Sequence, residues 1–365
     1  MNKYNFPIAT HSYFRALNVS EERTKFLQFD NYIPKFKYSN NFNVETLLFR
    51  QSFMAPDSME YLSLGCVLSG IRLQNDKNEI THFRQINEKM FGSPDVLYVK
   101  TLLKKMLKKS SMSSIQYSDE VIRILDNDLN SDEVFDLGPS KSTFEKYKVF
   151  FNNYRKQITN NHNFDVVTEI QRELINSGLS ERGWKLQVID GASHAYTDHN
   201  NKKIIIGKDY SPRTSMAAER IAVHEVYGHA LRGRQLSMVE SEGFAVVLEQ
   251  LLSREYKPRR TYRYLAASLG WGALGRPMTF REVFEILWRL MIISSKYNEK
   301  SAKEHAFGEC YRVFRGGSPE VPGAVYLKDL VYFDANQKIW HALSTRKFDY
   351  DDFVNIIEGR KVITL

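Results

Sequence analysis

The chain has 365 residues, enough for one large domain or two smaller ones. Hydrophobic residues make up 42% of it and aromatic residues 13%, which excludes disorder along the whole chain. No apolar run reaches the roughly 18 residues of a membrane-spanning helix, and the start has no apolar secretion signal, so we expect a cytoplasmic protein without a membrane partner. The net charge of +8 favours acidic partners, but the basic residues are spread out, so we expect no nucleic-acid partner.

The first part of the chain, residues 1–139, is predicted to be a mostly helical N-terminal region. Apolar residues at helical spacing predict helices over residues 45–55, 60–73 and 96–109. The last of these helices has one apolar stripe, formed by Val99, Leu102, Leu103 and Met106. Residues 108–140 are rich in serine and then acidic, and this composition is typical of a linker.

Residues 140–365 are predicted to form the second domain. Ser142 with Glu145 fits a capping box at the start of a helix, and Gly178 fits the end of the helix that follows. The apolar period then changes to two, which predicts strands over 184–190 and 193–208, the latter folded at a turn over 198–201.

The rest of this domain is predicted to be largely helical. Helices are expected over 213–231 and 241–254, and Thr279 with Glu282 fits a capping box before a helix over 280–295. The segment 323–343 is strand-like at first and then helical. This order of elements predicts an α+β fold that is mostly helical, with a small sheet beside the helix that carries the motif described next.

Two histidines and two glutamates lie close together in the sequence. His224 and Glu225 are followed by His229, and Glu242 begins the segment Glu-Gly-Phe-Ala. Two imidazoles and one carboxylate suit a zinc ion, and a glutamate beside the first histidine could take a proton from the metal-bound water. A single histidine in an apolar helix is usually a core residue, but this combination favours a metal site.

The spacing of the two histidines predicts a distorted helix. Residues five apart lie about 140° apart around a regular helix, so both imidazoles could not reach one ion. A single wide turn with i→i+5 hydrogen bonds would bring His229 under His224, and Gly228 permits such a turn. We therefore expect a bulge here, and a regular helix would contradict the metal site.

The carboxylate ligand has three candidates. Glu242 is followed one turn later by the small Ala245, which would let its helix approach the histidine helix closely. Glu249 shares a face with Glu242 and could orient a histidine, whereas Glu240 would point elsewhere.

At these residues the sequence resembles the microtubule-associated tyrosine carboxypeptidases and their bacterial relatives, which are named for a Gln-Glu-Gly-Leu-Ala motif. Their HExxxH motif and Glu-Gly-Leu-Ala segment are similar to 224–229 and 242–245, although Ser241 replaces the bacterial glutamine. Their RxxRG and KDxxY segments are similar to 312–316 and 328–332. The resemblance covers residues 140–350 and implies a zinc metallopeptidase of the gluzincin type.

The resemblance also implies roles for individual residues. Zinc would be bound by His224, His229 and Glu242, with Glu225 as the catalytic base. For a carboxypeptidase, the cations Arg312, Arg315 and Lys328 are candidates to bind the terminal carboxylate of the substrate, and Tyr332 is a candidate to hydrogen-bond the oxyanion. The expected partner is a peptide or protein C-terminal tail, with acidic tails and a terminal tyrosine or other aromatic residue among the options.

Two questions stay open at the level of sequence. Residues 202–208 could offer a sheet edge to an extended peptide, or could form an ordinary buried strand. The same metal centre would also serve an endopeptidase or an aminopeptidase, and a binding protein could hold a structural metal there. Glu225 argues against the structural site, because such a site needs no base beside its ligand.

Overall fold

The computed structural model describes most of the chain from residue 91 onward and a shorter stretch before it. The predicted helices over 45–55 and 60–73 lie outside the described residues. The described residues are 16–37, 81, 84–85, 87–88, 91–125, 129, 136–155, 165–190, 195–208, 210–212, 214–233, 238–295, 297–314 and 319–363.

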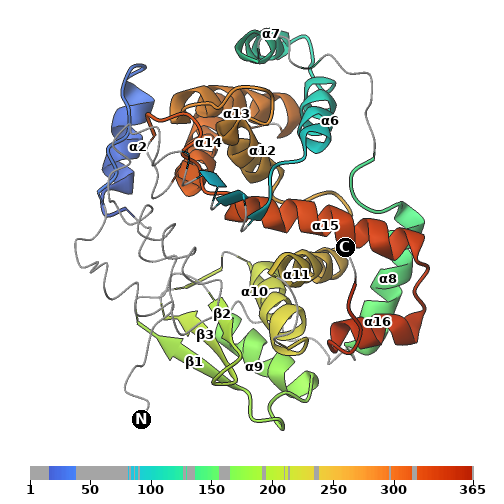
Figure 1. Ribbon diagram of the computed structural model, residues 1–365. Coiled ribbons are helices and arrows are strands. Elements are labelled where there is room, and N and C mark those ends of the chain that lie inside the picture. Colours follow the sequence, from blue (N-terminus) through green and yellow to red (C-terminus); the bar gives the residue numbers. More distant parts are fainter. Residues whose placement is uncertain are drawn as a thin grey trace. The chain divides into compact units, whose positions relative to one another are not determined.

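The described residues form a mostly helical structure with one three-stranded sheet, which confirms the predicted α+β class (Figure 1). None of the described helices is both long and apolar enough to cross a bilayer. The helices are α2 (Val19–Gln28), α6 (Val96–Leu107), α7 (Ile115–Ile124), α8 (Lys141–Tyr154), α9 (Val166–Asn176), α10 (Ser215–Val223), η1 (His224–Ala230), α11 (Met238–Ser253), α12 (Thr261–Trp271), α13 (Phe280–Ser295), α14 (Glu299–Phe314), α15 (Lys328–Thr345) and α16 (Tyr350–Ile357).

The chain divides into two compact units, and the second is interrupted in sequence. Unit 1 contains the described residues of Met1–Phe135 together with Arg260–Leu330, and unit 2 contains Asp136–Arg259 and Val331–Leu365. The first boundary falls close to the predicted one at 139/140. Residues 260–330 differ from the prediction, because α12, α13 and α14 pack with α6, α7 and α2, which come from the predicted N-terminal region.

Unit 1 is built from helices whose apolar faces meet. The predicted stripe of α6 is confirmed, since Val99, Leu102, Leu103 and Met106 are all buried. The predicted linker over 108–140 is wrong in part, because α7 forms within it and packs on α13 through the buried Val121. The predicted capping box of α13 is confirmed: the Thr279 backbone N–H donates to Glu282 Oε2 at 2.7 Å.

The sheet of unit 2 has the order β1-β3-β2, with bounds β1 (Lys185–Ile189), β2 (Ala195–Asp198) and β3 (Lys203–Gly207). β3 pairs in parallel with β1 and antiparallel with β2. β3 is therefore the central strand, so the expectation that it offers an edge to a peptide is wrong and the buried-strand alternative is confirmed. The predicted turn is confirmed by Asp198 Oδ1, which accepts from the Asn200 and Asn201 backbone N–H groups.

Of three further predictions for residues 140–365, one helix end is confirmed, and one capping box and one strand-like segment are wrong. Gly178 follows α9 with a φ of 68°, as the helix end requires. The capping box at Ser142 is wrong, because α8 begins earlier and Ser140 Oγ accepts from the Thr143 N–H. The strand-like part of 323–343 is wrong as well, since α15 begins at Lys328 and no described residue before it there forms a strand.

One apolar core holds unit 2 together. It gathers side chains from α8, α9, β3, α10, η1, α11, α15 and α16, and all of the contributing residues belong to unit 2. Its large, fully buried members include Phe151, Tyr227, Phe244 and Trp340. The histidine helix is thus packed into the core along one side, which fixes its position.

Candidate metal centre

The helix that carries the two histidines is bulged, as their spacing predicts. α10 is regular up to Val223 and continues as a π-turn over His224–Ala230. The Leu231 N–H donates to the Val226 carbonyl at 2.9 Å, which is the i→i+5 bond of this form. The wide turn brings residues five apart to one side of the helix.

Small residues let the ligand helices approach each other. A Cβ atom on Gly228 would lie 2.4 Å from the Ala245 Cβ, so no larger side chain fits between η1 and α11. The predicted close approach at Ala245 is therefore confirmed. It places Glu242, one turn earlier on α11, opposite the histidines.

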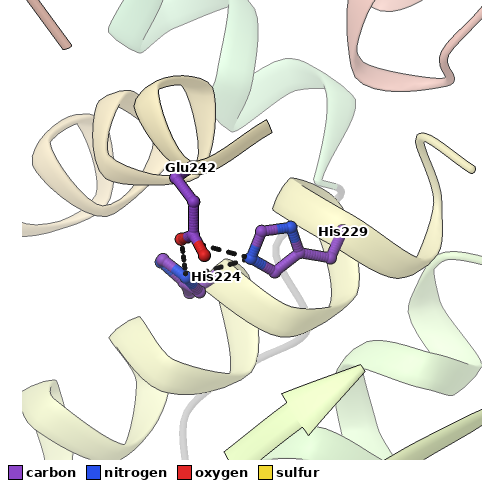
Figure 2. Close-up of side chains that lie close together, drawn as sticks. All are labelled: His224, His229 and Glu242. Atoms are coloured by element: carbon purple, nitrogen blue, oxygen red, sulfur yellow. Dashed lines mark hydrogen bonds and ion pairs between the residues drawn. The ribbon is translucent and has the colours of Figure 1, made fainter. Parts of the chain in front are cut away.

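Three ligand atoms converge at this point, as Figure 2 shows. His224 Nε2 and His229 Nε2 lie 3.1 Å apart. Glu242 Oε2 lies 3.3 Å from His224 Nε2 and 3.6 Å from His229 Nε2. The structure thus brings together the three residues that the sequence predicts as metal ligands.

The triangle of ligand atoms fits a small divalent cation. Tetrahedral ligands at zinc–nitrogen distances of about 2.0–2.1 Å are about 3.3–3.4 Å apart, close to the distances found here. Glu242 Oε2 is buried and makes no geometrically acceptable hydrogen bond, which a metal ion would remedy. The donor set of two imidazoles and one carboxylate therefore fits a metal of the zinc class.

Each imidazole is held by a hydrogen bond at its other ring nitrogen, Nδ1. His224 Nδ1 lies 2.7 Å from Glu249 Oε1, so the predicted orienting role of Glu249 is confirmed. Arg259 Nη1 lies 3.0 Å from the other oxygen of Glu249. His229 Nδ1 lies 2.7 Å from Ser241 Oγ, a contact that the sequence analysis missed. When Nδ1 carries the proton, Nε2 presents its lone pair to the centre.

The charges around the centre favour a positive ion within it. Burial disfavours a charged His224, but the neighbouring carboxylates of Glu242 and Glu249 outweigh burial and raise its pKa well above the usual value. Burial would raise the pKa of Glu242, but the two histidines hold it well below its usual value. A metal ion and protons would compete for the same atoms.

Glu225 directly follows the ligand His224 in the chain and is hydrogen-bonded to the sheet. The residue is buried, and Thr197 Oγ1 donates to Glu225 Oε2 at 2.8 Å. Thr197 belongs to β2, the strand that packs on η1. β2 is an outer strand of the described sheet, whereas the strand considered as a peptide-binding edge, residues 202–208, forms the central β3.

Glu240 is engaged away from the centre, as expected. Its Oε1 lies 3.2 Å from Arg232 Nη2 and accepts from the Ile363 N–H at 3.0 Å. Burial lowers the pKa of Arg232 to about 10 in spite of this partner. The pair anchors the chain after η1 to the C-terminal residues of unit 2, and Glu240 is excluded as a ligand.

Four further residues are predicted from the sequence to act on the substrate: Tyr332 as a catalytic residue at the oxyanion, and Arg312, Arg315 and Lys328 at the terminal carboxylate. Tyr332 is buried and belongs to the part of α15 in unit 2. Three residues later on the same helix, Ala335 packs against Gly243, the residue after Glu242. Arg312 belongs to unit 1, and its Nε lies 3.0 Å from both oxygens of the buried Asp329. Lys328 begins α15 in unit 1, and Arg315 lies outside the described residues. The roles of these four residues stay predictions.

Comparisons of the chain with protein-family models, with curated proteins and with solved structures gave no match.

Proposed function

We propose that this protein is a zinc-dependent peptidase, and that it removes the C-terminal residue of peptide or protein tails. The observation that carries the proposal is the convergence of His224 Nε2, His229 Nε2 and Glu242 Oε2 on one point, with the buried Glu225 next to a ligand. A structural metal site would not need that additional carboxylate.

Zinc held by these three residues would polarise the scissile carbonyl and acidify water. Glu225 would take the proton from the attacking water and later deliver it to the leaving amine, so that one peptide bond and one water become a carboxylate and an amine. Thr197 supports this role, because its hydrogen bond keeps one oxygen of Glu225 in place.

The strand β2, which lies at the outside of the described sheet, is the best candidate to lie along the substrate path. An extended peptide can add to a sheet edge by backbone hydrogen bonds, and β2 packs on the helix that carries the ligands. This arrangement would suit any peptidase with this centre. The choice of a carboxypeptidase follows from the resemblance of segments 312–316 and 328–332 to the tyrosine carboxypeptidases.

The test uses the purified chain loaded with zinc and a mixture of peptides ending in tyrosine or phenylalanine. The mixture includes C-terminally amidated and N-terminally acetylated copies, and the products are identified by mass spectrometry with and without a chelator. Loss of one C-terminal residue from free-acid peptides only, blocked by the chelator, is the expected result.

Other outcomes would change the assignment. Internal cuts in amidated peptides would indicate an endopeptidase, and dependence on a free N-terminus would indicate an aminopeptidase. Protein that contains zinc and cleaves none of the peptides would favour a binding protein with a structural metal.

A further inference from the structure

The π-turn is tied to a buried charged network through one of its own residues. Tyr227 lies between the two histidines and is almost fully buried. Its hydroxyl donates to Glu173 Oε2, on α9, at 2.9 Å. Its ring packs edge-on against Phe151 and Tyr154 of α8. The turn is therefore anchored by a directed hydrogen bond as well as by apolar packing.

The acceptor of this bond is itself held by two arginines. Glu173 is fully buried, and its Oε1 lies 3.2 Å from both Arg155 Nε and Arg172 Nη2. Burial would raise the pKa of Glu173, but Arg155 and Tyr227 hold it below its usual value, so the acceptor stays charged. Arg155 also lies 2.7 Å from Glu219 of α10, five residues before His224. The network thus holds the helix both before and within the π-turn.

A regular helix would be the ordinary conformation of this segment, and it would separate the two imidazoles. Each residue turns an α-helix by about 100°, so loss of the wide turn would rotate His229 relative to His224 by about that amount. The same rotation would move Tyr227 relative to Glu173. The bond between these two residues therefore favours the wide turn over the regular one.

We propose that Tyr227, Glu173 and Arg155 are positioning residues that hold His224–Ala230 as a π-turn and so create the metal site from the opposite side of the helix. This inference rests on the proposed metal centre, but none of the three residues belongs to the ligand set. Their removal would weaken metal binding without removing a ligand.

The test compares two tyrosine variants of the full chain. Tyr227→Phe removes the hydroxyl that bonds Glu173, and Tyr147→Phe is the matched control. Tyr147 is a fully buried member of the same core, and its hydroxyl donates to the Leu343 carbonyl at 2.9 Å, away from η1. Three quantities are measured: zinc affinity by competition with a chromophoric chelator, the visible spectrum of the cobalt-loaded protein, and amide hydrogen exchange over 224–231 without metal.

The expected result is a zinc dissociation constant at least about ten-fold higher in Tyr227→Phe, with an altered cobalt spectrum. Tyr147→Phe should leave both unchanged even if it lowers stability as much. If Tyr227→Phe kept the wild-type zinc affinity and cobalt spectrum, or if Tyr147→Phe had an equal effect, the proposed positioning role would be refuted. The proposed function would not be affected by that result.

A chain that binds no zinc at all would refute the proposed function instead. The positioning role of the network is then tested by hydrogen exchange alone. Exchange over 224–231 should be faster in Tyr227→Phe than in Tyr147→Phe, and equal rates would refute the role.

Discussion

At the scale of single residues, the two histidines of the candidate centre have different partners. The Nδ1 atom of His224 contacts a carboxylate, Glu249, whereas that of His229 contacts a neutral hydroxyl, Ser241. A charged acceptor makes the imidazole a stronger donor of electrons to a metal than a neutral one does. We therefore expect His224 to be the more strongly binding imidazole, and Glu249 to influence affinity more than Ser241.

The substitution Glu249→Gln tests the contribution of this carboxylate. An amide removes the charge and can donate its own N–H to Nδ1, which would favour the wrong tautomer of His224. The zinc dissociation constant should rise about 10- to 100-fold, as measured by chelator competition. Glu255→Gln is the control. Glu255 contacts the same arginine as Glu249, at 3.4 Å from Arg259 Nε, but no described contact joins it to His224. Equal losses in both variants would contradict the prediction.

The substitution Glu225→Gln separates metal binding from catalysis. Gln cannot accept the proton of water, so turnover of a peptide substrate should disappear while zinc content stays at the wild-type level. His229→Ala is the contrasting variant and should lose zinc as well as activity. An active Glu225→Gln protein would show that the base is another residue.

At the scale of elements, α11 is packed on small residues at two points next to Glu242. Gly228 of η1 meets Ala245, and Gly243 of α11 meets Ala335 of α15, where an added Cβ would lie 2.5 Å from the alanine Cβ. These contacts set the distance between the helix that carries the carboxylate and the helix that carries the imidazoles. The centre therefore depends on the absence of side chains as well as on its ligands.

Gly228→Ala should separate η1 from α11. Overpacking lowers the free energy of unfolding by about 1–3 kcal/mol, and the better helix propensity of alanine offsets about 1 kcal/mol of this loss. Zinc affinity should fall as well, because the ligands move apart. Gly308→Ala is the matched control within α14, where an added Cβ would have no described neighbour within 4 Å. It should leave zinc affinity unchanged and stabilise the fold by up to about 1 kcal/mol in chemical denaturation. Unchanged zinc affinity in Gly228→Ala would contradict this account.

The elements that could be predicted from the sequence have strong local signals. α6 has a clear apolar period and α13 has a capping box. The histidine spacing predicts the bulge of η1 once both histidines are taken as ligands of one metal ion. Thr197, Ser241 and Tyr227 were missed as partners of the centre, because a hydroxyl group in a strand or helix follows no pattern that indicates its acceptor. Such contacts depend on residues that meet only after folding.

At the scale of the whole molecule, the chain order does not reveal the two units. A composition change near residue 139 marks one boundary, but the return of residues 260–330 to unit 1 depends on which helices pack together. That pairing relies on complementary apolar faces far apart in sequence. The predicted continuous second domain could not anticipate it.

Zinc should stabilise unit 2 rather than the whole chain evenly, because all three ligands belong to it. Free zinc at about 100 times its dissociation constant adds about 2.7 kcal/mol to the stability of the state that binds it. Hydrogen exchange with and without zinc should show added protection over 214–233 and 238–253 and none in α13. Equal protection of α13 would show that the two units unfold together.

The interrupted path of unit 2 also has a consequence for the order in which the protein is made. The core behind the histidine helix includes Trp340, Phe353 and Ile363, which the ribosome adds after the whole of residues 260–330. Domains fold as units during synthesis, and the N-terminal ones generally fold first. Here the metal-binding unit cannot complete its core until Ile363 has emerged, so a nascent chain should acquire zinc only after residues 260–330 have been made.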